Sequence, residues 1–113
     1  MHEMSLAEGV LQVIEDSARR EGFQRVKELR LEIGRLSGVE IEALRFCFDA
    51  VTRGSMAEGA ALEIILLPGR AWCFPCGQAV EIDTDLATCP RCGGIELQVQ
   101  GGNEMRIKDL LVD

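Results

Sequence analysis

Two cysteine pairs constrain this chain more than any other feature of its sequence. The first reads C-F-P-C-G from Cys73, the second reads C-P-R-C-G from Cys89, and twelve residues separate the pairs. Four thiolates at this spacing can close a tetrahedron around one metal ion, and the glycine after each pair permits a tight turn. We expect Cys73, Cys76, Cys89 and Cys92 to form a closed metal site that supports a fold and does not catalyse.

Four cysteine ligands are typical of both zinc sites and iron sites, so the ligand type alone leaves both metals open. Rubredoxin-like electron carriers hold iron between similar pairs, so an iron site is an alternative. We favour structural zinc, because the linker is short and few aromatic residues surround it. Local disulfides or a redox pair fit poorly with a chain that has no secretion signal. A segment this short buries too little surface to fold alone, so the metal would supply its stability, about 10–16 kcal/mol in small zinc modules.

Outside the cysteine segment, the hydrophobic pattern predicts alternating helices and strands. Apolar residues recur at helical spacing over about residues 5–21, and a period of two over 29–33 predicts a strand with one buried face. A second helix is expected over about 41–51, after a capping box of Ser37 and Glu40. The apolar run 61–67 predicts a buried strand.

The remaining apolar tail completes the expected fold. Residues 103–113 carry apolar side chains with a break in phase, which predicts a third strand with a bulge. The predicted class is α+β, a small three-stranded sheet with two helices packed on one face, plus an inserted four-cysteine, zinc-ribbon-like subdomain. We expect residues 1–70, completed by 103–113, to form the body, and residues 71–102 to form the zinc-binding subdomain. Cys47 is expected to be a buried apolar thiol on the second helix.

Charge and length exclude several classes of function. The 113 residues carry a net charge of -7, and neither the body nor the cysteine segment is basic, so a nucleic-acid-binding zinc ribbon is disfavoured. No apolar run reaches the ~20 residues of a membrane span, and the first residues do not resemble a signal peptide. We expect a cytoplasmic protein with neither nucleic acid nor membrane as a partner.

The first three residues form a second candidate metal site. His2 is the only histidine of the chain. In second position, its imidazole can bind a metal together with the amine of Met1 and the intervening backbone nitrogens. Planar nitrogen donors suit Ni(II) and Cu(II), and Glu3 adds a carboxylate within reach.

These motifs together resemble a known family. The quoted features are M-H-E at residues 1–3, G-R-L-S-G-V-E at 34–40, A-E-G-A at 57–60 and the two cysteine pairs. Over its whole length the chain resembles the HypA/HybF nickel metallochaperones of hydrogenase maturation. The resemblance implies that Met1, His2 and Glu3 bind nickel, and that Cys73, Cys76, Cys89 and Cys92 bind zinc.

The resemblance also implies a function and partners. A member of this family passes Ni(II) toward the large subunit of [NiFe]-hydrogenase, in concert with a HypB-type GTPase. The chain has no P-loop of its own and no Ser/His/Asp set, so we expect a binding protein and not an enzyme. A homodimer is compatible with this interpretation. The competing hypotheses are a rubredoxin-like iron carrier and a zinc-ribbon interaction module.

Overall fold

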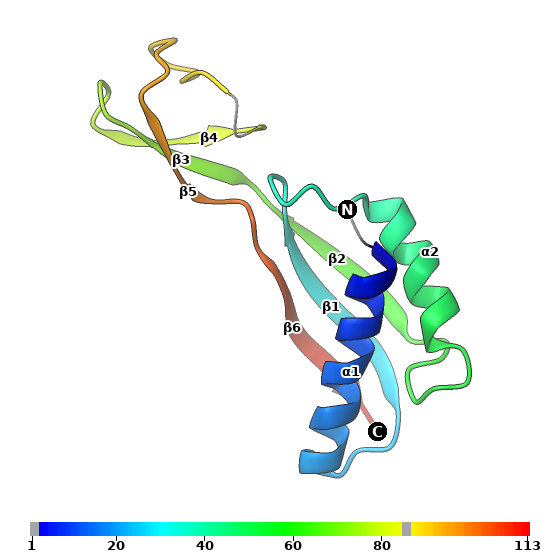
Figure 1. Ribbon diagram of the computed structural model, residues 1–113. Coiled ribbons are helices and arrows are strands. Elements are labelled where there is room, and N and C mark those ends of the chain that lie inside the picture. Colours follow the sequence, from blue (N-terminus) through cyan, green and yellow to red (C-terminus); the bar gives the residue numbers. More distant parts are fainter. Residues whose placement is uncertain (1–2, 85–86) are drawn as a thin grey trace. The chain divides into compact units, whose positions relative to one another are not determined.

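The computed structural model describes residues 3–84 and 87–113, which form two helices and six strands (Figure 1). In chain order these elements are α1 (Glu3–Glu21), β1 (Val26–Gly34), α2 (Ile41–Thr52), β2 (Ala61–Leu67), β3 (Gly69–Cys73), β4 (Gln78–Ile82), β5 (Leu97–Gly101) and β6 (Met105–Val112). The strands make two three-stranded sheets, β2-β1-β6 and β4-β3-β5. The α+β class predicted from the sequence is confirmed.

The contacts between Cα atoms divide the chain into two compact units. Unit 1 consists of residues 1–31, 39–64 and 107–113, and unit 2 consists of residues 32–38 and 65–106. Each unit has its own buried residues. No helix in the described part of the chain is long and apolar enough to cross a membrane.

Unit 1 is built by two helices that pack along one face of the β2-β1-β6 sheet (Figure 1). Along β1, Leu29 and Leu31 are buried, as is Ile33 in the part of the strand that belongs to unit 2, whereas the charged residues between them are only half-buried. The predicted strand with one buried face is therefore confirmed. The helices contribute the other half of this core through Ile14, which is fully buried, and through Phe48, which is 3% exposed.

The ends of the two helices test the predicted caps. α1 ends at Glu21, and Gly22 follows it with a φ of 80°, as its place after the helical pattern predicts. The predicted N-terminal cap of α2 is wrong. Ser37 lies in a turn in which its amide donates to Gly34 O at 3.1 Å, and Glu40 caps the helix by accepting from Glu42 N at 3.2 Å.

Two predictions of burial are also wrong. β2 is an edge strand of its sheet, and none of its residues is fully buried, with Leu66 47% exposed. An apolar run does not distinguish a central strand from an edge strand, which explains the error. Cys47 is half-buried and not buried, because the buried face of α2 carries Leu44, Phe48 and Thr52.

Unit 2 contains the antiparallel sheet β4-β3-β5. Trp72 of β3 lies opposite Ala79 of β4 and Gln98 of β5 in the two registers. One face of this sheet carries a small buried cluster, whose members are Ala71, Cys73, Val80, Ile82 and Cys89. Leu36, Cys76, Ala87 and Leu97 pack against it. Two of the five cluster residues are therefore cysteines of the predicted metal site.

Three glycines allow backbone segments of unit 2 to approach each other closely. A Cβ added at Gly102, whose φ is 112°, would lie 2.6 Å from Gly69 Cα, and a Cβ at Gly34 would lie 1.9 Å from Gly102 O. Neither position has room for a side chain. The backbone around Gly102 is thus a tightly packed crossing, and Leu36 N donates to Gly102 O there at 2.7 Å.

Candidate metal centre

The two C-x-x-C-G segments adopt the same local structure. In the first, Gly77 N donates to Cys73 O at 2.8 Å, and in the second, Gly93 N donates to Cys89 O at 2.8 Å. Both glycines have a positive φ, 63° at Gly77 and 74° at Gly93. A side chain at either position would be strained, so the glycine of each segment is required for its turn.

These turns bring four sulfurs to one point. Every ligand atom of Cys73, Cys76, Cys89 and Cys92 lies within 4.8 Å of the others. The distance from Cys73 Sγ to Cys92 Sγ is 3.6 Å, and that from Cys76 Sγ to Cys89 Sγ is 3.9 Å. Both are far longer than a disulfide bond, and all the cysteines are free.

The spacing of the sulfurs fits zinc. Four thiolates that surround Zn²⁺ at about 2.3 Å in a tetrahedron are about 3.8 Å apart, and the two measured distances lie on either side of this value. The four-cysteine cluster therefore fits a closed structural zinc site.

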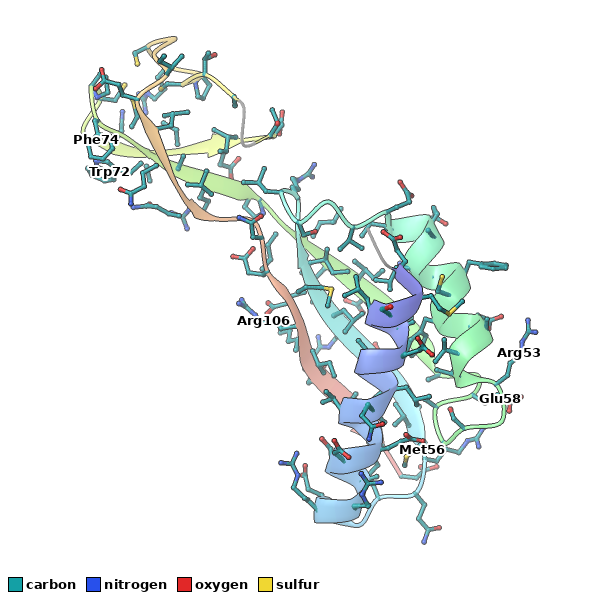
Figure 2. All side chains as sticks on the ribbon, in the orientation of Figure 1. Arg53, Met56, Glu58, Trp72, Phe74 and Arg106 are labelled. Atoms are coloured by element: carbon teal, nitrogen blue, oxygen red, sulfur yellow. The ribbon has the colours of Figure 1, made fainter. Side chains whose placement is uncertain are left out.

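Cys73 lies between two aromatic residues in the sequence. The alternation of side chains along a strand explains how its sulfur still reaches the cluster. Cys73 is fully buried, whereas Trp72 is half-buried and Phe74 is 57% exposed. Figure 2 shows Trp72 and Phe74 close together at one end of β3. The two aromatic side chains therefore do not occupy the buried face of the sheet, on which the Cys73 sulfur lies.

The protein environment alone shifts the pKa values of three of the four thiols. The amides of Cys92 and Arg91 donate to Cys89 Sγ at 3.5 and 3.4 Å, and they lower the pKa of that thiol to about 6. Hydrogen bonds with the Cys73 and Cys92 thiols raise the pKa of Cys76 to about 12. Burial raises the pKa of Cys73. Of these three thiols, Cys89 therefore has the lowest pKa and loses its proton most readily.

The other predicted site lies mostly outside the described residues. Of Met1, His2 and Glu3, only Glu3 is described, as the first residue of α1. The amide of Glu40, at the start of α2, donates to Glu3 Oε2 at 3.0 Å. A carboxylate at this end of α1 also interacts favourably with the helix dipole. Sequence reasoning missed this contact, because the two residues are 37 positions apart and only the capping pattern drew attention to Glu40.

The comparison with protein families decides the identity of the chain. The model of the family described as "Hydrogenase/urease nickel incorporation, metallochaperone, hypA" matches residues 1–112. The chain belongs to the HypA family. Members of this family are nickel metallochaperones, which confirms the predicted resemblance. The match favours a nickel carrier over the rubredoxin-like and zinc-ribbon hypotheses.

Individual relatives agree with this assignment over their full lengths. The chain is 61% identical to the hydrogenase maturation factor HypA of Albidiferax ferrireducens, and the match covers 100% of both chains. It is 62% identical to the protein of the same name from Rhodobacter capsulatus over 112 residues, which are 99% of each chain.

A solved structure supports the fold. The solution structure of the nickel metallochaperone HypA from Helicobacter pylori matches with a TM-score of 0.70 and 22% identity. The match covers 99% of this chain and 97% of that one. At this identity, the likeness confirms the fold alone.

Proposed function

We propose that this chain binds Ni(II) as its cargo through Met1, His2 and Glu3, and delivers the ion for the maturation of [NiFe]-hydrogenase. The observation that carries the proposal is the match to a nickel-incorporation family over residues 1–112, which include the M-H-E sequence. The donor types agree with the cargo. An amine, an imidazole and backbone nitrogens favour Ni(II), and the Glu3 carboxylate is a further oxygen donor.

The contact between Glu3 and Glu40 supports the proposed nickel site. Glu3 Oε2 accepts a hydrogen bond from the amide of Glu40, so this carboxylate is held at the start of α2. A donor held in place loses less conformational entropy when it binds a metal than a freely rotating one does.

We further propose that Cys73, Cys76, Cys89 and Cys92 bind one zinc ion with a structural role. In this assignment unit 1 carries the nickel site and unit 2 carries the zinc site. A complete set of four thiolates leaves no open coordination position. The protein would then be a carrier and not an enzyme.

The proposed partners follow from this role. The nickel acceptor is the large subunit of [NiFe]-hydrogenase, and a HypB-type GTPase supplies the nucleotide hydrolysis for which this chain has no P-loop. Both encounters would take place in the cytoplasm. Binding of the purified chain to each partner, with and without Ni(II), tests this part of the proposal.

Nickel titration of matched variants tests the site itself. His2→Ala should abolish stoichiometric Ni(II) binding without loss of zinc, because the two sites share no ligand. Glu3→Gln should weaken nickel binding, whereas Glu8→Gln, which makes the same change further along α1, should leave it unchanged. Unchanged nickel stoichiometry in His2→Ala would contradict the proposed site.

An N-terminal extension tests the amine of Met1 separately. Extension converts this amine to an amide and so removes one proposed donor. Protein that carries an uncleaved tag should bind Ni(II) more weakly than the same protein after cleavage to Met1. Equal affinities would show that the amine is not a ligand. Metal analysis of the same preparations should find zinc and not iron.

A further inference from the structure

The four cysteines of the metal centre differ in their exposure to solvent. Cys73 is 0% exposed and Cys89 is 2% exposed, and both belong to the buried cluster of unit 2. Cys76 is half-buried, whereas Cys92 is exposed. A reagent that arrives from solvent therefore meets one ligand of the site before the others.

Gly94, two residues after Cys92, leaves space next to the Cys92 sulfur. A Cβ at Gly94 would lie 3.2 Å from Cys92 Sγ and 3.9 Å from Pro75 Cγ. Any side chain at position 94 would therefore crowd the space next to the sulfur. With glycine there, the described contact from this residue to Cys92 Sγ is a single amide hydrogen bond of 3.4 Å.

Hydrogen bonding, like exposure, makes Cys92 more reactive than Cys89 toward an electrophile. Cys89 Sγ accepts from two amides, those of Arg91 and Cys92. Each such bond withdraws electron density from sulfur and lowers its reactivity toward an electrophile. Cys92 Sγ accepts from Gly94 N, so it is both the more exposed and the more nucleophilic of these two ligands.

We propose that Cys92 is a site of modification by hydroperoxides, and that its oxidation opens the metal centre by coupling Cys92 to Cys73. This inference rests on the zinc ligation proposed above. Cys73 Sγ lies 3.6 Å from Cys92 Sγ, and it belongs to the opposite C-x-x-C pair.

The chemistry requires one equivalent of peroxide. The Cys92 thiolate attacks one peroxide oxygen, the O–O bond breaks, and Cys92 becomes a sulfenic acid while hydroxide leaves. The Cys73 thiolate then attacks the Cys92 sulfur, an S–S bond forms, and a second hydroxide leaves. Two thiolates lose two electrons in total, and the peroxide gains them. Zinc retains two of its four ligands and is released.

Peroxide treatment of the zinc-loaded, full-length protein tests this sequence of events. Substoichiometric hydrogen peroxide should release about one zinc per peroxide consumed, measured with a chromogenic chelator. Peptide mapping without reduction should find the Cys73–Cys92 disulfide. A disulfide within either C-x-x-C pair, or retention of zinc with oxidation confined to Cys47, would overturn the proposal. Protein isolated without zinc would instead contradict the proposed ligands.

Two variants add matched controls. Cys47→Ser removes the remaining cysteine of the chain and should release zinc at the wild-type rate. Gly94→Ala retains all four ligands but places a methyl group against Cys92 Sγ, so it should slow zinc release several-fold. Gly9→Ala, where a Cβ meets nothing within 4 Å, should leave the rate unchanged. An unchanged rate in zinc-loaded Gly94→Ala would contradict the proposed route of access. If Gly94→Ala does not retain zinc, the proposal is tested by the disulfide that peptide mapping finds in the wild-type protein.

Discussion

The two units of this protein are stabilised by different means. Unit 1 buries large side chains from both helices and from β1, among them Ile14, Leu29, Leu44 and Phe48. The buried cluster of unit 2 contains Ala71, Val80 and Ile82, and its other two members, Cys73 and Cys89, are proposed metal ligands. Hydrophobic burial can support unit 1, whereas unit 2 has a small core and would gain its stability from the proposed zinc ion.

This difference suits a metal carrier. If zinc stabilises unit 2, the thiolates are fully used by a structural ion and do not compete for the cargo. Nitrogen donors at the start of unit 1 then bind nickel without any change in the ligands of the zinc. The comparison can be tested by perturbing each unit separately.

The largest expected effect is the loss of zinc. Cys73→Ser leaves three thiolates, and it should remove most of the stabilisation by zinc, about 10–16 kcal/mol in small zinc modules. Amide hydrogens of β3 and β4 should lose their protection from exchange, while those of α1 and α2 retain it. Hydrogen exchange followed by mass spectrometry measures both.

Cys47→Ser is the matched control for this experiment. Cys47 lies on α2 and outside the four-sulfur cluster, so its replacement should leave zinc content and exchange in β3 and β4 unchanged. Loss of protection throughout the chain in Cys73→Ser would show that the two units unfold cooperatively, and would contradict the comparison.

The reverse perturbation removes part of the core of unit 1. Phe48 is 3% exposed, and Phe48→Ala should destabilise unit 1 by about 3–5 kcal/mol through lost burial and a cavity. The helix signal in circular dichroism should then disappear at a lower urea concentration. Zinc content at low urea should not change, and a variant that loses zinc together with its helices would count against independent stabilisation.

A smaller effect is expected at the glycine crossing of unit 2. Gly102 has a φ of 112° and no room for a Cβ, so Gly102→Ala should cost about 1–3 kcal/mol in backbone strain and crowding. The change should raise amide exchange in β5 before it affects α1. Gly9→Ala provides the control, because this position is open and helical, and alanine there should stabilise α1 by about 0.5–1 kcal/mol.

Local sequence patterns were sufficient to predict much of the fold. The 3.6-residue period identified both helices, the alternation of Leu29, Leu31 and Ile33 with charged residues identified β1, and the spacing of the cysteines identified their cluster. Each of these signals depends on residues close together in the chain, and hydrophobic burial or metal chemistry enforces it.

The remaining features depend on contacts between distant residues. Ser37 and Glu40 are both plausible caps for α2, and the turn from Gly34 to Ser37 decides between them. The bond between the Glu40 amide and Glu3 has no local signature. The unequal exposure of the four cysteines also cannot be read from two C-x-x-C-G segments of the same pattern. The difference arises because Cys73 is the last residue of β3 and is buried against the sheet, whereas Cys92 is not part of a strand and is exposed.

The smallest expected effect concerns an ion pair of unit 1. Asp109 accepts from Arg30 Nε at 2.6 Å and from Arg30 Nη2, and these hydrogen bonds hold the pKa of Asp109 below its ordinary value. Because the pKa is lower in the folded state, the pair stabilises unit 1 fully above the unfolded pKa of about 3.9. This contribution is lost as the pH falls through the folded pKa.

Asp109→Asn should therefore lower the stability of unit 1 slightly at pH 7, and the difference from wild type should vanish at low pH. Both side chains of the pair are about two-fifths exposed, at 38% for Arg30 and 42% for Asp109, so solvent screening keeps the effect small. Urea unfolding followed by the helix signal between pH 7 and pH 2 measures it. Asp49→Asn makes the same charge change in a looser and more exposed pair with Arg53, 3.5 Å apart, and should change the stability at pH 7 less. A stability difference for Asp109→Asn that persists at pH 2 would mean that the carboxylate acts through packing and not through its charge.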